Sequence, residues 1–160
     1  VMKFSFTREN LLGPLQLVIG AVEKRQTMPV LSNVLLRAAN GQLQLIGTDL
    51  EIELVADTQI PLDVEGDVTV PARKLLDICK NLPDNAEIKF SFAKDRVTLS
   101  SGRSRFVLAT LPSTDFPALE SLSFDVHFSV PRNRFRELIE RTAFAMAQQD
   151  VRYYLNGLLL

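Results

Sequence analysis

Three carboxylates alternate along one short stretch of the chain, GTDLEIEL at residues 47–54. Asp49, Glu51 and Glu53 occupy every second position, and on an extended strand such side chains point the same way. Carboxylates grouped in this manner could bind a hard cation such as Ca²⁺ or Mg²⁺. The same alternation also describes a half-exposed strand, with its acids in water and its apolar residues buried. We expect the second arrangement, a strand without a metal.

The other side chains that could do chemistry stand alone. His127 is the only histidine and Cys79 the only cysteine. His127 has no acid or thiol at the spacing of a metal or catalytic pair, and Cys79 falls on the apolar face of a helical pattern, where a thiol is inert. The stretch SSGRSRF at 100–106 has a single glycine, too few for a phosphate-binding loop. We therefore expect no enzyme activity and no cofactor.

Positive side chains gather on the segments expected to be helical or to follow a helix. They are Lys24 and Arg25, then Arg73, Lys74 and Lys80, and then Arg132, Arg134, Arg136 and Arg141. The formal net charge is only −1, so we expect the balancing acids on the strands, on the other side of the fold. A cationic helix side could hold a phosphate backbone without reading sequence. Arginines on a helix are also commonly a solvated face, and the charge pattern alone leaves both interpretations open.

The elements that must position these side chains repeat along the chain. Alternating stretches at 4–6, 68–70 and 128–130 each precede a helical pattern whose apolar face begins at Leu11, Leu75 and Phe135, 64 and 60 residues apart. Thr7 can cap the first helix, while Pro71 and Pro131 suit the start of the other two.

Strands follow the first two helices. Residues 30–60 predict three strands with a tight turn at Asn40-Gly41, and residues 86–112 predict three more, with turns near Lys94-Asp95 and Ser101-Gly102. The repeated unit is therefore one strand, one helix and three strands. Two such units predict an α+β fold with helices on one side and antiparallel sheets on the other.

The third copy of the unit breaks off early. We expect one domain at 1–118, a linker at 119–125 and the incomplete beginning of a second domain at 126–160, with YYLNGLLL at 153–160 as an apolar strand at an open edge. We also expect the 160 residues to be a fragment of a protein more than twice as long. No apolar run is long enough to span a bilayer, no secretory signal is evident, and a single cysteine suits a reducing cytoplasm.

Five stretches, taken in order, resemble the bacterial DNA polymerase III beta subunit family, the replicative sliding clamps. They are MPVLSN at 28–33, GTDLEIEL at 47–54, TVPARKLLDICKNLP at 69–83, SGRSRFVLATLP at 101–112 and FAMAQQDVRYYLNG at 144–157. The resemblance implies the DNA-clamp fold, in which a subunit has three similar domains, each built from two copies of the unit. Two subunits of that family close head to tail into a ring around duplex DNA. The ring tethers polymerase and catalyses nothing itself.

The resemblance also implies roles for particular residues. Those matching DNA-contacting positions are Arg25, Arg73, Gln149, Tyr153 and Tyr154. The family also has a cleft that binds short motifs of DNA polymerase III, other polymerases and the clamp loader. Arg152 and Leu155 match the start of this cleft. In the full-length homodimer of the family, one edge of the first domain meets the third domain of the partner subunit. The residues that match this edge are Lys74, Arg96, Arg103, Arg105, Phe106 and Leu108.

An alternative remains at this point. The same repeats could serve a structural adaptor or dimerisation module that never touches DNA. The two hypotheses differ in whether Arg25, Arg73, Gln149 and the two tyrosines converge on one surface.

Overall fold

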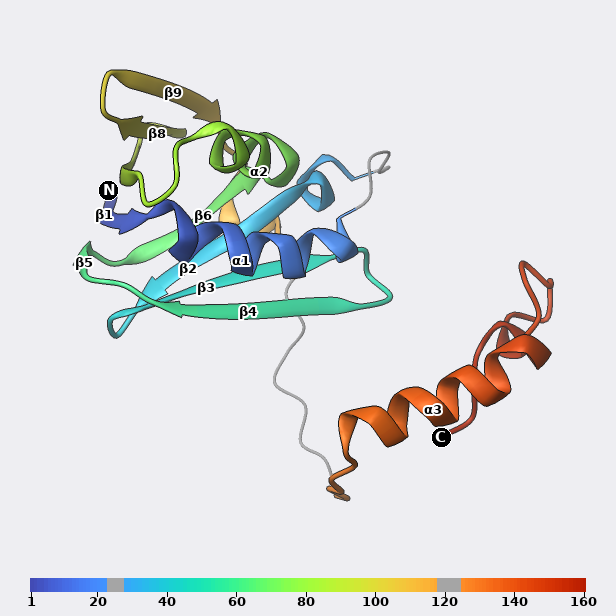
Figure 1. Cartoon of the computed structure of the whole chain (residues 1–160). Coiled ribbons are helices and arrows are strands. Elements are labelled where there is room, and N and C mark those ends of the chain that lie inside the picture. The colour runs from blue at the N-terminus through green and yellow to red at the C-terminus, as the bar shows by residue number, and fades with distance from the viewer. Residues whose placement is uncertain (23–27, 118–124) are drawn as a thin grey trace. The chain divides into compact units, whose positions relative to one another are not determined.

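The computed structural model describes residues 1–22, 28–117 and 125–160. The chain divides into two compact units, Val1–Glu120 and Ser121–Leu160, and each is described by itself (Figure 1). The predicted domain limits at 118 and 126 stay predictions, since residues 118–124 lie outside the described part. None of the helices in the described ranges is long and apolar enough to cross a membrane.

The described residues of the first unit form two α-helices and two sets of strands. The helices are α1 (Arg8–Val18) and α2 (Ala72–Asn81), with short 3₁₀ turns η1 (Ile19–Ala21), η2 (Pro29–Ser32) and η3 (Ser113–Asp115). The strands are β1 (Met2–Thr7), β2 (Asn33–Ala39), β3 (Gln42–Thr48), β4 (Glu53–Gln59), β5 (Leu62–Val64), β6 (Gly66–Pro71), β7 (Glu87–Ala93), β8 (Arg96–Ser101) and β9 (Ser104–Ala109). The predicted order of one strand, one helix and three strands is confirmed twice, with the short β5 added.

The strands form two antiparallel sheets that exchange their first strands. One sheet has the order β5-β1-β7-β8-β9 and the other β4-β3-β2-β6. The strand that opens the first repeat, β1, pairs with β7 of the second repeat from Met2↔Phe92 to Thr7↔Glu87. The strand that opens the second repeat, β6, pairs with β2 of the first. The two repeats are therefore interlocked into one domain, and the predicted α+β class is confirmed.

The helices pack side by side and bury the faces that their spacing predicted (Figure 1). Helix α1 buries Leu11, Leu15 and Val18, and α2 buries Leu75 and Cys79. Burial raises the pKa of the Cys79 thiol to about 12, so this thiol is neutral and unreactive at physiological pH.

One glycine and one arginine fix how the helices sit. A Cβ on Gly47 of β3 would lie 2.9 Å from the carbonyl oxygen of Val18, so only glycine lets the end of α1 approach the sheet this closely. The Arg8 guanidinium donates to the carbonyl of Cys79 at 2.7 Å and to Asp84 at 2.9 Å. Because Cys79 lies in the last turn of α2, this cation joins the start of α1 to the negative end of α2.

The predicted hairpin turns are confirmed by backbone conformation. Asn40 and Gly41 have φ of 53° and 73°, and Lys94 and Asp95 have φ of 51° and 58°. Two successive residues with positive φ give the turn whose twist matches that of paired strands.

The expected strand through GTDLEIEL is wrong. Strand β3 ends at Thr48 and β4 begins at Glu53; between them the Asp49 carboxylate accepts hydrogen bonds from the N–H groups of Glu51 and Ile52 at 2.9 and 2.8 Å. These bonds lower the pKa of Asp49. An aspartate that bonds its own following backbone competes with strand pairing. As a result Leu50 and Ile52, expected to be buried, are 57% and 48% exposed.

In the second unit, residues 125–160 form one α-helix, α3 (Arg132–Thr142), and two short turns, η4 (Ala143–Ala145) and η5 (Tyr153–Asn156). The strands expected at 128–130 and 153–160 are wrong, because residues 126–131 are irregular and η5 is a 3₁₀ turn. In the first unit an opening strand pairs with a strand of the sibling repeat. No such strand exists among the described residues of the second unit.

A small apolar cluster and a buried hydroxyl hold the end of the first unit. Phe116 packs with Val30, Leu31, Leu35 and Ile46. The fully buried Thr69 of β6 pairs with Leu111 in an isolated bridge. These contacts fix the last segment of the unit against the four-stranded sheet.

The Thr69 hydroxyl predicts a stability difference between two substitutions. It donates to the carbonyl of Leu111 at 2.7 Å and accepts from the Asn33 amide at 2.9 Å and the Leu111 N–H at 3.2 Å. Thr69→Val keeps the shape but leaves the buried Asn33 amide without its acceptor, so we expect it to lower the free energy of unfolding by about 1–3 kcal/mol. Thr69→Ser keeps the hydroxyl and is the control. Urea titration measures both, and equal losses would contradict the assigned role of the hydroxyl.

Candidate nucleic-acid and subunit interfaces

Arg73 lies in the first turn of α2 with an exposed side chain. Its guanidinium donates to the carbonyl of Val22 at 2.8 Å. A guanidinium has five N–H donors, so this bond leaves others able to meet a phosphate. Val22 is the last described residue before 23–27, and Arg25 therefore lies outside the described residues.

The predicted separation of charge is only partly found. Helix α2 exposes Arg73, Lys74 and Lys80 against Asp77. However, the outer face of the five-stranded sheet also carries exposed cations, Lys3 on β1, Lys89 on β7 and Arg105 on β9. The expected placement of the negative charge on the sheet side is therefore wrong for the five-stranded sheet, because alternation places lysine and arginine on the solvent face of a two-sided strand as readily as acids.

In the second unit a closed loop presents Gln149 and the tyrosine pair. Asp150 and Asn156 are joined by two hydrogen bonds of 3.0 Å, one in each direction, and the Ala147 N–H donates to the Leu155 carbonyl at 2.9 Å. Sequence reasoning missed these shaping residues, although an aspartate and an asparagine flanking a short turn are a signal for such a loop.

The candidate functional residues of this loop are exposed to solvent. Gln149 is exposed with φ of 58°. Tyr153 and Tyr154 are 83% and 70% exposed, and their rings meet edge to face at 6.3 Å between centroids. Exposed aromatic rings are suited to stacking on unpaired bases.

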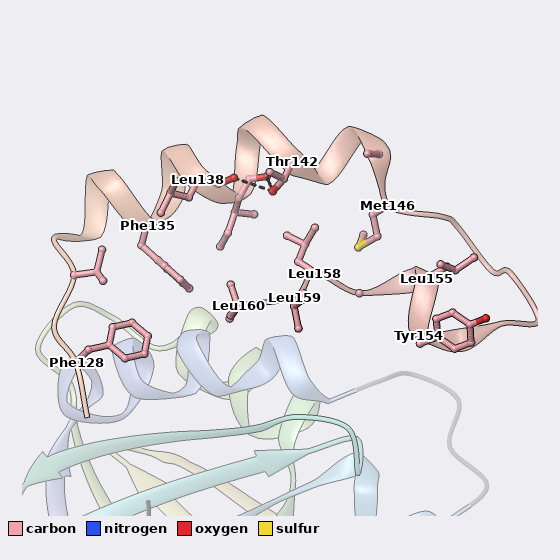
Figure 2. Close-up of a pocket in the computed structure, with 14 residues that line it drawn as sticks. Phe128, Phe135, Leu138, Thr142, Met146, Tyr154, Leu155, Leu158, Leu159 and Leu160 are labelled. Atoms are coloured by element: carbon pink, nitrogen blue, oxygen red, sulfur yellow. Dashed lines mark hydrogen bonds between the residues drawn. The ribbon is translucent and has the colours of Figure 1, made fainter. Parts of the chain in front are cut away.

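Arg152 and Leu155 occupy different surroundings in the same loop. The Arg152 guanidinium donates to both carboxylate oxygens of Asp150 at 3.0 Å, which lowers the pKa of Asp150 and raises that of Arg152. Leu155 and Tyr154 instead line an open apolar groove. The groove lies between α3 and the residues at 157–160, and Figure 2 shows its labelled side chains.

The arginines of α3 are mostly paired along the helix. Arg134 and Arg141 both pair with Glu137, and Arg136 pairs with Glu140. All are exposed, and exposed pairs of this kind bind weakly, so they would exchange readily for another anion.

The six residues expected at the subunit edge surround β9. This strand ends the five-stranded sheet and has no partner on its outer side among the described strands. Phe106, Leu108 and Lys74 line a groove between β9 and α2. Pairing places Arg96 and Arg105 on the outer face, and Arg103 lies in the β8–β9 turn.

The groove includes residues that sequence reasoning missed. They are Asp77, Ile78, Asn81 and Val107. The first three follow Lys74 at intervals of three and four, the spacing of one helix face, which is the signal that could have found them.

Two interlocked repeats with adjacent helices and an open basic edge define a clamp-type domain. The family model of the DNA polymerase III beta subunit, N-terminal domain, matches residues 2–120, and the chain belongs to this family. It is 56% identical over 160 residues to the beta sliding clamp of Pseudomonas putida, covering 99% of this chain and 44% of that protein. With the beta sliding clamp of Escherichia coli K12 it is 52% identical over 159 residues, covering 99% and 43%.

Solved structures agree. The DNA polymerase III subunit beta from Pseudomonas aeruginosa superposes with a TM-score of 0.93 at 53% identity, covering 98% of this chain and 43% of that one. The pol III beta of Caulobacter crescentus gives a TM-score of 0.92 at 40% identity, covering 98% and 42%. The chain thus spans less than half the length of the curated relatives it matches.

The exposed face of α3 predicts a difference in hydrogen exchange between the two units. Phe135, Leu138 and Ile139 are 37%, 60% and 36% exposed, whereas Leu75 and Cys79 at the matching face of α2 are fully buried. We expect the amides of α3 to exchange much faster than those of α2 in dilute solution, because local opening of α3 costs little burial. Mass spectrometry measures both helices in one sample. Equal protection would show that the second unit is stable by itself.

Proposed function

We propose that the chain forms the first domain, and the start of the second, of a sliding clamp that encircles duplex DNA and tethers DNA polymerase III. The observation that carries the proposal is the interlocked two-repeat fold of this family, with α1 and α2 side by side and the exposed Arg73 at the start of α2. The clamp acts in the cytoplasm as a processivity factor without catalytic activity. Its partners are double-stranded DNA, DNA polymerase III and other polymerases, and the clamp loader.

A ring that slides needs weak and sequence-independent contacts. The formal net charge of −1 avoids the tight, salt-resistant binding of a strongly basic protein. Arg73, and Arg25 three residues after Val22, supply contacts to phosphates, which position a protein on DNA without reading its sequence. Gln149 adds a neutral donor, and Tyr153 and Tyr154 offer rings on which unpaired bases stack.

The groove beside α3 supplies the start of the partner cleft. Leu155 with Tyr154 forms its apolar wall. Arg152 is held by Asp150, so we assign it the role of fixing the loop that carries Leu155. Short apolar motifs of polymerases and of the clamp loader would lie here, as amphipathic or extended segments do in apolar grooves.

The β9 edge supplies the subunit contact of the full-length homodimer. Its arginines and the groove residues Phe106 and Leu108 are suited to an antiparallel strand with acidic neighbours. The third domain of the partner subunit would meet this edge.

Arg73→Ala should weaken DNA binding equally for all sequences. Loss of one phosphate contact should flatten the slope of log K against log salt by about one unit, and Arg25→Ala should do the same. Lys89→Ala is the matched control, since it removes one exposed cation from the outer face of the sheet. Fluorescence anisotropy at several salt concentrations measures the effect. Unchanged binding by both arginine variants would contradict the role assigned to these two residues, and no measurable DNA binding by the unchanged chain would favour the DNA-independent adaptor.

Arg103→Glu with Arg105→Glu should abolish the ring dimer of the full-length protein. Each glutamate would place a negative charge at an edge that is suited to an acidic partner, and like charges across an interface oppose association. Analytical ultracentrifugation of the full-length protein measures the dimer. Lys3→Glu, on β1 of the same sheet, is the control; a dimer that survives the double change would place the subunit contact elsewhere.

A further inference from the structure

The last described segment of the first unit, residues 111–117, crosses one face of the four-stranded sheet, and we call it the strap. Phe116 of the strap is 6% exposed and packs against Leu35 of β2. The next residue of β2, Leu36, belongs to the main core, and successive residues of a strand point to opposite faces. The strap therefore lies on the face that is turned away from the main core.

The turn η2 depends on the same small cluster. Val30 and Leu31 of η2 are 5% and 1% exposed and complete this cluster with Phe116, which is separate from the main core of the unit. Because η2 is a single 3₁₀ turn outside both sheets, its position depends on these buried side chains and not on a ladder of hydrogen bonds. Phe116 thus covers the side chains that hold η2.

A buried chain of hydrogen bonds joins the start of the strap to the end of η2. The Thr69 hydroxyl donates to the Leu111 carbonyl at 2.7 Å and accepts from the Leu111 N–H at 3.2 Å. The Asn33 side-chain amide donates to the same hydroxyl at 2.9 Å, and Asn33 directly follows η2. Asn33 and Thr69 are 5% and 0% exposed. A buried polar group that loses its partner is costly, so the chain opposes separation of the strap from η2.

We propose that residues 111–117 hold η2 against the sheet, so that release of the strap also releases η2. The apolar contact through Phe116 and the polar chain through Thr69 are two separate ties between the same two elements. The predicted linker at 119–125 follows the strap in the sequence, so the ties connect η2 to the junction between the two units. A coupling free energy is reciprocal, and a change that loosens either element loosens the other.

The strap also has a consequence for DNA binding, and only this step rests on the proposed function. Arg25 lies outside the described residues, and η2, which begins at Pro29, is the first described element after it in the sequence. A fixed η2 limits where the chain just before it can go. Phe116 is therefore a positioning residue for the proposed phosphate contact of Arg25, and it touches no DNA itself.

Amide hydrogen exchange followed by NMR tests the coupling. Phe116→Ala should speed exchange of the Leu31 amide, and Val30→Ala that of the Phe116 amide, each by about tenfold or more. Phe116→Leu should give a smaller change in both elements, which keeps the test open where the alanine variant folds poorly. Phe92→Ala is the matched control, since Phe92 packs against the main core from β7.

The control should leave the exchange of η2 and of the strap unchanged, because both open locally without the main core. Faster exchange confined to the strap in Phe116→Ala would overturn the proposal. An equal effect of Phe92→Ala on η2 would overturn it too, since the loss would then be one of general stability.

DNA binding by single and double variants tests the positioning step. Phe116→Ala should lose part of the affinity that Arg25→Ala loses, and the double variant should bind as weakly as Arg25→Ala alone. Combined with Arg73→Ala, the effect of Phe116→Ala should instead multiply, as for independent sites. Full affinity of Phe116→Ala, or a double variant weaker than Arg25→Ala, would overturn this step. Unchanged binding by Arg25→Ala itself would contradict the proposed phosphate contact, and the exchange experiment would still decide the strap.

Discussion

The exchange of first strands between the two repeats is the constraint on which the rest of the structure depends. Because β1 pairs with β7 and β6 with β2, neither repeat can complete a sheet by itself. The aromatic stack of Phe4 on Phe90, 4.5 Å between centroids, lies across one of these pairs. The exchange also sets the helices side by side, since each helix directly follows an exchanged strand. The site residues on α2 thus owe their position to strand pairing.

The same exchange explains why the second unit differs from the first. Its sequence has the strand and amphipathic helix patterns of both other repeats and shares a proline at the helix start with the second, and α3 forms where the pattern predicts it. The opening strand does not form, because a strand needs a partner while a helix satisfies its own backbone. Helix α3 therefore stands with its apolar face open to the groove. Local sequence is enough to define the helix, and only tertiary pairing can define the strand.

The sequence predicted the periodic parts of the fold and missed the parts decided by local side-chain bonds. Hairpins at Asn40-Gly41 and Lys94-Asp95 followed from turn residues that accept positive φ. The turn at Asp49 was missed because alternation of acids and apolar residues is the same in a strand and in this turn, and only the bonds to Glu51 and Ile52 decide between them. Of the candidate site, the β9 edge could be located from sequence. The closed loop around Asp150 and Asn156 needed the structure.

The stable contacts of the proposed clamp are those between strand edges, and its contacts to DNA are weak. An edge strand offers a row of backbone donors and acceptors with apolar residues beside it, and such a contact holds at any salt concentration better than separated charges do. Contacts to phosphates must by contrast exchange quickly for the protein to slide. Arg73 is suited to this because one of its donors is already bound to the Val22 carbonyl, which holds the exposed side chain in place and leaves its other donors for a phosphate. In the proposed clamp, the contacts between sheet edges would keep the ring closed, and the weak phosphate contacts of its helix residues would let it move along DNA.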